Sequence, residues 1–113
     1  MYTKYEDEGF APLKPGISMK VVGHGEHTLS ALFHLEAGRV LPLHEHLYEQ
    51  TGTLLKGRLT LTIGDDTFQA SPGDTWTIPP HVPHQAEVPE DCLVFEVFSP
   101  VREDYLERSR REG

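Results

Sequence analysis

Two histidines, a carboxylate and an amide lie close together in residues 41–50, LPLHEHLYEQ. Residues two apart in a β-strand point to the same face of a sheet, so His44 and His46 can offer two imidazoles to one metal ion. By the same alternation, the Gln50 side chain lies on the face of the two imidazoles and the Glu49 side chain lies on the opposite face. A bend in the chain before Glu49 would reverse that choice, so Glu49 stays open as an alternative ligand.

A third imidazole ends the stretch SPGDTWTIPPHVPH, residues 71–84. Three prolines, Pro79, Pro80 and Pro83, restrict the turn that leads to His84 and would hold its side chain in place. Imidazoles from separate segments are typical of a transition-metal site. Because a His-x-His pair alone is a weak signal, unliganded histidines are the simpler alternative.

The other histidines and the single tryptophan are less informative. His24 and His27 lie in a Gly-rich turn and are expected on the surface. His34 lies on the less apolar face of TLSALFHL and is expected either to line a pocket or to lie outside it. His81 is expected at the rim of the site. Trp76 could line a pocket, although a tryptophan in a strand is usually part of a core.

Short apolar or alternating runs predict the elements that must position these side chains. From Ile17 onward the runs are separated by Gly, Pro or Asp, a pattern typical of an antiparallel sandwich or barrel: ISMKVV, TLSALFHL, RLTLTI, TFQA, TWTI and LVFEVF. After Pro100 the run VREDYLERSRRE is rich in helix formers. It predicts a short helix that packs Val101, Tyr105 and Leu106 against the barrel.

The chain of 113 residues is therefore predicted to be a single all-β domain. Its expected parts are an N-terminal arm or first strand over residues 1–16, a barrel over residues 17–100, and a C-terminal helix and tail over residues 101–113.

Acidic residues outnumber basic ones, 18 to 10, and the formal charge is −8. This is the wrong sign for binding nucleic acid or an anionic membrane surface, so a small-molecule partner is expected. The single cysteine, Cys92, cannot form an internal disulfide, and the chain shows neither a signal peptide nor a membrane-spanning apolar run. We therefore expect a cytoplasmic protein.

Two motifs with fixed spacing occur in the chain. The first consists of Gly38, His44-Glu45-His46, Gln50 and Gly57, and the second of Gly73, Pro79-Pro80-His81 and His84. With Gln50 in place of a glutamate and His81 in place of a glycine, they match the two motifs of the cupin superfamily at every spacing. The sequence therefore resembles the cupins, which implies a single jelly-roll barrel, also described as a double-stranded β-helix.

The resemblance implies one divalent metal ion, Zn, Ni, Fe or Mn, with four ligands: His44, His46, Gln50 and His84. An amide oxygen is a weaker donor than a carboxylate and brings no charge. The ion would therefore act as a stronger Lewis acid, and the acid–base group would have to come from elsewhere in the pocket. A degenerate barrel without metal is the alternative.

The last predicted strand and its exit, LVFEVFSPVREDYL, resemble the small cupins of pectin degradation, the KdgF-like cupins, which linearise unsaturated uronates. That resemblance, from Ile17 to Leu106, implicates Glu96, Phe98 and Arg102 in the site, with Glu96 in place of the family's aspartate. The residues alone also allow a structural interpretation. In it Phe98 belongs to the core, Glu96 faces solvent, and Arg102 pairs with an acid at the helix start.

The resemblance implies an enzyme that opens the ring of a small anionic, sugar-derived substrate by metal-assisted proton transfer. Glu96 or a water on the metal would move the proton, and Arg102 would pair with the substrate carboxylate. Phe98 would pack on the sugar ring, and Gly52 would leave open space above the metal. A metal-dependent dioxygenase and a non-catalytic ligand-binding or sensor cupin are the alternatives. A homodimer is the usual state of single-domain cupins.

Overall fold

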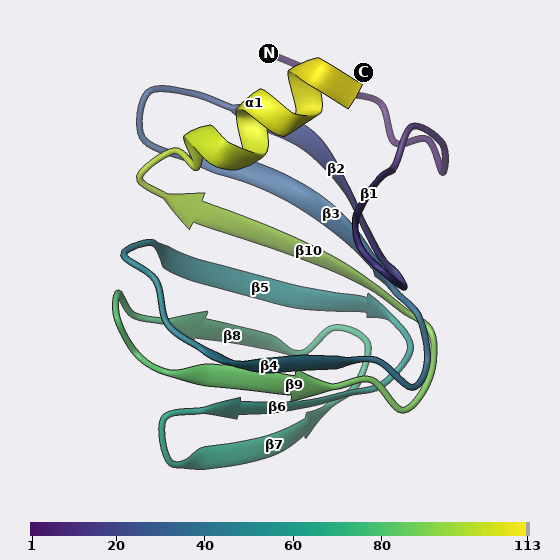
Figure 1. Ribbon diagram of the computed structural model, residues 1–113, viewed down its shortest axis with the longest axis vertical. Coiled ribbons are helices and arrows are strands. Elements are labelled where there is room, and N and C mark those ends of the chain that lie inside the picture. The colour runs from purple at the N-terminus through teal and green to yellow at the C-terminus, as the bar shows by residue number, and fades with distance from the viewer. Residues whose placement is uncertain (113) are drawn as a thin grey trace.

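The computed structural model describes residues 1–112, with side chains described through residue 110. In this part of the chain ten strands are followed by one helix (Figure 1). The elements are β1 (Ala11–Lys14), β2 (Ile17–His24), β3 (Leu29–Leu35), β4 (Val40–His44), β5 (Glu49–Lys56), β6 (Leu59–Ile63), β7 (Asp66–Ala70), β8 (Thr75–Ile78), β9 (His84–Glu87), β10 (Cys92–Ser99) and α1 (Glu103–Glu112).

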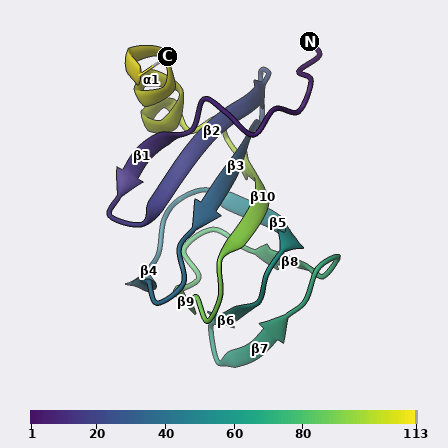
Figure 2. The same cartoon turned by 90° about the vertical axis from the view of Figure 1, so that its right-hand side faces the viewer.

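The described strands form two antiparallel sheets, which Figures 1 and 2 show as an upper and a lower layer. The six-stranded sheet has the order β1-β2-β3-β10-β5-β8, and the four-stranded sheet has the order β4-β9-β6-β7. Strands far apart in the sequence are neighbours in both sheets, as in a jelly roll. The predicted all-β jelly-roll fold is therefore confirmed.

Alternating side chains explain how the two sheets pack. On β8 the apolar Trp76 and Ile78 are buried while the alternating Thr75 and Thr77 are exposed, and on β10 Val94 and Phe98 point into the core. The largest fully buried side chains are Phe98, Leu29, Leu54 and Ile78. Each such side chain contributes roughly 1.5–3 kcal/mol when removed from water. The core therefore fills the space between the sheets and fixes which faces point inward.

The C-terminal helix α1 adds to this core. Leu106 is buried, and Val101 and Tyr105 pack against the core cluster, as the sequence predicts. Glu103 and Asp104 lie in the first turn, where negative charge suits the positive end of the helix dipole. No helix within residues 1–112 has the length and apolar character needed to cross a bilayer.

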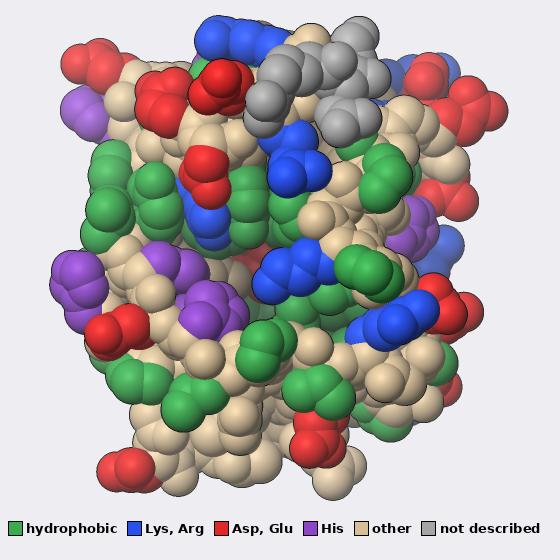
Figure 3. Space-filling view, viewed as in Figure 1, with side chains coloured by type: hydrophobic (Ala, Val, Ile, Leu, Met, Phe, Trp, Pro, Cys, Tyr) green, Lys and Arg blue, Asp and Glu red, His purple; other side chains and the backbone are tan. Residues whose placement is uncertain are grey.

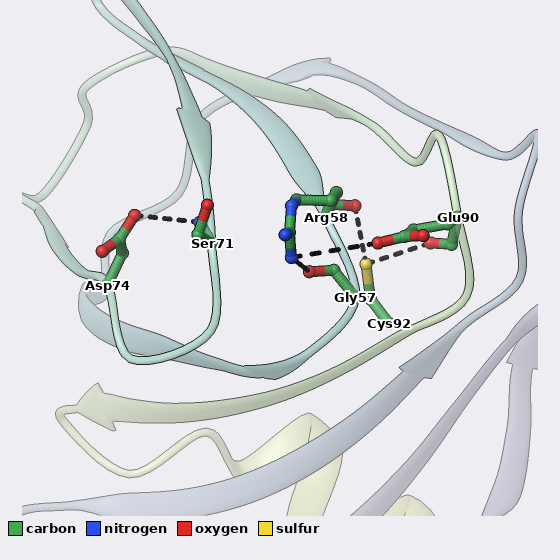
Figure 4. Close-up of polar contacts among 6 residues, drawn as sticks. All are labelled: Gly57, Arg58, Ser71, Asp74, Glu90 and Cys92. Atoms are coloured by element: carbon green, nitrogen blue, oxygen red, sulfur yellow. Dashed lines mark hydrogen bonds and ion pairs between the residues drawn. The ribbon is translucent and has the colours of Figure 1, made fainter.

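A polar cluster fixes the end of the sandwich where β5 turns into β6 and β10 begins (Figure 4). The Cys92 thiol lies 2.9 Å from the carbonyl oxygen of Arg58 and 3.1 Å from that of Glu90. Arg58 also donates to the carbonyl of Gly57 at 2.9 Å. Burial raises the pKa of the Cys92 thiol. Cys92 therefore acts as a buried packing and hydrogen-bonding group rather than as a reactive thiolate.

Gly57→Ala is expected to destabilise the fold. Gly57 has a φ of 95°, in the left-handed region, and a Cβ there would collide with the carbonyl of Asp91 and lie 2.9 Å from Cys92 Sγ. Strain of this kind costs about 1–3 kcal/mol, and urea denaturation should show a loss of that size in the free energy of unfolding. Gly25→Ala is the matched control, because nothing lies within 4 Å of its Cβ position. Equal stabilities of the two variants would contradict the prediction.

Candidate metal centre

The chain crosses from one sheet to the other between β4 and β5 (Figure 1). His44 and His46 lie at the start of this crossing. His44 is the last residue of β4, and β5 begins in the other sheet at Glu49. Residues 45–48 belong to neither strand. The prediction that one continuous strand holds His44, His46 and Gln50 on a common face is therefore wrong. The chain has to bend here because β4 and β5 belong to different sheets.

β9 brings His84 to these histidines, since His84 pairs with His44 across the β4–β9 ladder. The turn before His84 is tied to the crossing, because the backbone N–H of His81 donates to the carbonyl of His46 at 2.8 Å. His81 has a φ of 63°, in the left-handed region that favours glycine. This explains why the motif has glycine at this position. The His81 side chain is exposed, so its contribution is made by its backbone.

Among the described residues, His44, His46 and His84 form a cluster whose ligand atoms all lie within 4.8 Å of one another. The ring centroids of His44 and His84 are 4.2 Å apart. The Nδ1 atoms of His44, His46 and His84 lie 2.8–3.0 Å from the backbone carbonyl oxygens of Pro42, Tyr48 and Val82, respectively. An Nδ1–H that donates to such a carbonyl leaves the lone pair of Nε2 free for a metal. The three histidines are thus held in the tautomer that a metal ligand needs.

Gln50 is the fourth side chain at this centre. Its Oε1 lies 3.0 Å from His46 Nε2. When Nδ1 of His46 carries the proton, both atoms are acceptors, and a cation between them satisfies the pair. Burial lowers the pKa of His46 and of His84, which favours the neutral imidazoles that bind metals. The donor set therefore fits a divalent ion, whereas Glu49 is exposed and outside the cluster.

Glu96 is buried beside this centre, with 7% of its surface exposed. It points inward from β10, like Val94 and Phe98, so the interpretation that placed its carboxylate in solvent is wrong. Burial raises the pKa of Glu96 to about 8, although the nearby Gln50 amide and Trp76 N–H lower it in part. The carboxyl group is therefore mostly protonated near neutral pH and can act as an acid.

The guanidinium of Arg102 is surrounded by aromatic rings and one carboxylate. It lies 3.6 Å from the ring centroid of Tyr105, 4.8 Å from that of Tyr48 and 5.0 Å from that of Phe98. Its Nε and Nη2 donate to the carboxylate of Asp104 at 3.2 and 2.8 Å. Arg102 thus forms the ion pair at the helix start that the structural interpretation suggested, and it also lines the cavity described next.

These groups line one cavity of about 130 Å³, whose polar lining includes His44, His46, Gln50, His84, Glu96 and Arg102. Figure 3 shows histidine side chains beside a hollow on this face, next to basic and hydrophobic side chains. Phe98 is a core residue, 2% exposed, whose ring also borders the cavity, with its centroid 6.3 Å from that of His46. A mostly apolar cavity with a few convergent polar side chains is typical of a small-molecule site.

Gly52 does not line this cavity. The position that its Cβ would take is filled by Glu96 Oε2 and by Trp76, whose Nε1 lies 2.6 Å from it. The expectation of open space above the metal is therefore wrong, because two neighbouring side chains occupy that space.

The family of this chain follows from a match to the Cupin domain family over residues 31–98, more than half of the sequence. The chain is a cupin. No curated protein matches the sequence at a significant level.

Solved structures of the same fold are similar to this cupin over most of its length. It is similar to KdgF from Halomonas sp., with 28% identity and a TM-score of 0.88 over 93% of this chain and 97% of that chain. An RmlC-like cupin from Shewanella frigidimarina has 21% identity and a TM-score of 0.86, with 93% and 96% of the chains covered. A salicylate 1,2-dioxygenase from Pseudoaminobacter salicylatoxidans has 17% identity and a TM-score of 0.72, with 87% of this cupin and 29% of that chain covered. The last two similarities show the fold alone.

Two aromatic residues that surround Arg102 were not predicted to be there. Tyr48 faces Arg102 from the sheet crossing, and Tyr105, expected only to pack, faces it from α1. The helical spacing of three between Arg102 and Tyr105 was a usable signal. His34 lies elsewhere, with its Nε2 2.8 Å from the Asp7 carboxylate.

His44→Ala and His84→Ala are expected to abolish metal binding while the barrel stays folded, because each removes one of the three imidazoles of the cluster. Elemental analysis of purified protein and isothermal titration with Zn²⁺ or Ni²⁺ measure this, and circular dichroism checks the fold. His24→Ala is the control, since His24 is exposed and outside the cluster. Full metal occupancy in either cluster variant would refute the assignment.

Proposed function

We propose that this cupin is a metal-dependent enzyme that linearises a small anionic, sugar-derived substrate, an unsaturated uronate, by proton transfer. The observation that carries the proposal is that one small cavity is lined by the three-histidine cluster, a buried carboxyl group, Glu96, and a partly buried cation, Arg102. These groups supply a metal site, a proton donor and an anion partner. The similarity to KdgF over nearly the full length of both chains supports the same assignment.

Arg102 is suited to binding the substrate carboxylate. Asp104 occupies its Nε and Nη2 and fixes the plane of the guanidinium, which leaves Nη1 to pair with an anion in the cavity. The rings of Tyr48, Tyr105 and Phe98 restrict the remaining freedom of the side chain. A sugar ring could pack on the part of Phe98 that borders the cavity.

Glu96 is suited to moving the proton. An unsaturated uronate is a cyclic enol ether with an anomeric hydroxyl group. Ring opening takes a proton from that hydroxyl, breaks the bond between the ring oxygen and the anomeric carbon, and returns a proton to the enol carbon. A protonated Glu96 can give that proton and recover one from the hydroxyl, so no oxidant is required. His44, His46, Gln50 and His84 would hold a divalent ion, which would supply Lewis acidity toward a substrate oxygen.

The remaining expectations stay predictions. These are a homodimer, a small-molecule partner and a cytoplasmic location. The edge strands β1 and β8 of the six-stranded sheet are candidate pairing surfaces for a second copy, and light scattering would test the dimer.

The first test of the function is turnover under anaerobic conditions. Protein loaded with Zn²⁺, Ni²⁺ or Mn²⁺ should convert unsaturated uronates to their linear form, seen as loss of the absorbance of the conjugated double bond. Glu96→Gln should reduce kcat at least about 100-fold, the usual contribution of a general acid. Glu87→Gln is the control because Glu87 is exposed on β9. Turnover that depends on oxygen would contradict this proposal and favour a metal-dependent dioxygenase. Tight binding of uronates without turnover would favour a non-catalytic ligand-binding or sensor cupin.

Arg102→Ala is expected to raise KM for the uronate about 10- to 100-fold, since a charge-assisted hydrogen bond contributes about 1.5–3 kcal/mol. Metal content should stay unchanged, because Arg102 is not part of the histidine cluster. Arg58→Ala is the control, since Arg58 is exposed and lies among the contacts of Figure 4 rather than in the cavity lining. An unchanged KM in Arg102→Ala would remove its role in binding the carboxylate.

A further inference from the structure

A row of three inward-facing residues crosses three adjacent strands beside the candidate metal centre. Glu96 on β10 pairs with Gly52 on β5, and Gly52 pairs with Trp76 on β8. All three are buried. Residues opposite one another in neighbouring strands present their side chains to the same face of the sheet, so Glu96 and Trp76 extend over the middle position.

The middle position of this row has to be glycine. A Cβ on Gly52 would collide with Glu96 Oε2 and lie 2.6 Å from Trp76 Nε1 and 2.7 Å from Trp76 Cε2. The two polar atoms therefore meet over Gly52, in the space that any other residue would fill.

The two atoms have complementary chemistry. Within the described residues, Trp76 Nε1 and Glu96 Oε2 are the buried side-chain polar atoms without a well-formed hydrogen bond. An indole nitrogen is only a donor, and a carboxyl oxygen is an acceptor. Buried polar atoms are rarely left unpaired, so a small adjustment that pairs these two is favoured. Both residues also line the cavity that holds the histidine cluster.

We propose that Trp76 is a positioning residue for Glu96: its Nε1–H donates to Oε2 across Gly52 and leaves Oε1 as the oxygen that exchanges a proton with the substrate. The role in proton exchange rests on the proposed function, but the contact between Trp76 and Glu96 does not. A fixed carboxyl orientation lets the proton leave from one oxygen toward one place in the cavity. The ligand class is that of the proposed function, an anionic sugar derivative with an exchangeable proton.

The contact can be tested without any activity. Trp76 is the single tryptophan of the chain, so the ¹⁵N-labelled protein has one indole N–H resonance. That resonance should lie downfield and exchange slowly with solvent. Glu96→Met, which keeps a long side chain without an acceptor, should move it upfield and speed its exchange at least about tenfold, whereas Glu96→Gln, which keeps a carbonyl, should preserve most of the protection. Glu87→Gln on β9 is the control.

An indole resonance that is the same in folded Glu96→Met and in the wild type would overturn the contact. If Glu96→Met does not fold, Gly52→Ala tests the contact instead. Its Cβ would separate Trp76 Nε1 from Glu96 Oε2 and must therefore shift the indole N–H resonance. An unshifted resonance in Gly52→Ala would also overturn the proposal. Gly25→Ala, with no atom within 4 Å of its Cβ position, controls for the added methyl group.

The positioning role is tested by kinetics. Trp76→Phe should keep metal content and KM within about twofold and lower kcat at least about tenfold, because the carboxyl group loses its fixed orientation but not its place. Phe68→Leu removes a partly buried aromatic ring that is outside the cavity lining and should leave kcat unchanged. Wild-type kcat in Trp76→Phe would overturn the positioning role. The resonance test stands whether or not the wild type turns over uronates, so failure of the function and failure of the contact are separate results.

Discussion

Burial of ionisable side chains between two apolar sheets is the constraint on which this site depends. Among the described residues, His84 and Glu96 are the polar or charged side chains that are buried, and both line the same cavity. Removing such groups from water costs free energy unless partners compensate. Apolar side chains at both positions would pack between the sheets without that cost. The convergence of these two groups beside the three-histidine cluster therefore favours a binding site over a purely structural core.

Gln50 connects the two halves of the site. Its Oε1 lies 3.0 Å from His46 Nε2, and its amide lies close enough to Glu96 to lower the pKa of that carboxyl group against the effect of burial. A glutamate here, as in the usual cupin motif, would put a second carboxylate beside Glu96. Repulsion between the two would push the pKa of one of them still higher. The amide avoids this conflict, which gives a physical reason for the departure from the motif in a chain with a buried glutamate on β10.

Motif spacing predicted the side chains around the centre better than strand alternation did. Strand alternation selected Gln50 by assuming one continuous strand through His44, His46 and Gln50. That assumption is wrong, because His46 lies in the crossing between β4 and β5. Alternation with Val94 and Phe98 was enough to place Glu96 inside, which agrees with the site role implied by the family resemblance and not with the solvent-facing alternative. The all-β fold and the C-terminal helix followed from local patterns and needed no knowledge of pairing.

The contact over Gly52 could not be predicted from the sequence. It depends on the register of β10 against β5 and of β5 against β8, which joins positions 44 and 24 residues apart in the chain. Register of this kind is set by which faces are buried once all the strands pair, and a shift of one residue would move Glu96 to the other face of its sheet. A single glycine in a strand signals a close approach of other atoms, but not which ones.

The cavity differs in charge from the protein that surrounds it. The chain has a formal charge of −8, whereas the cavity lining includes the cations Lys14 and Arg102, the three-histidine cluster and a glutamate whose pKa is raised to about 8. At physiological salt, charges are screened beyond about 8 Å, so the acidic surface has little influence inside. Attraction of an anion is therefore local, and Asp104 already neutralises one edge of Arg102. Under the proposed function, selection among anions would depend on a carboxylate that reaches the free edge of Arg102 while another oxygen of the same molecule lies at the histidine cluster. In that case the distance between Arg102 and the histidine cluster, more than charge, would decide which small acid fits.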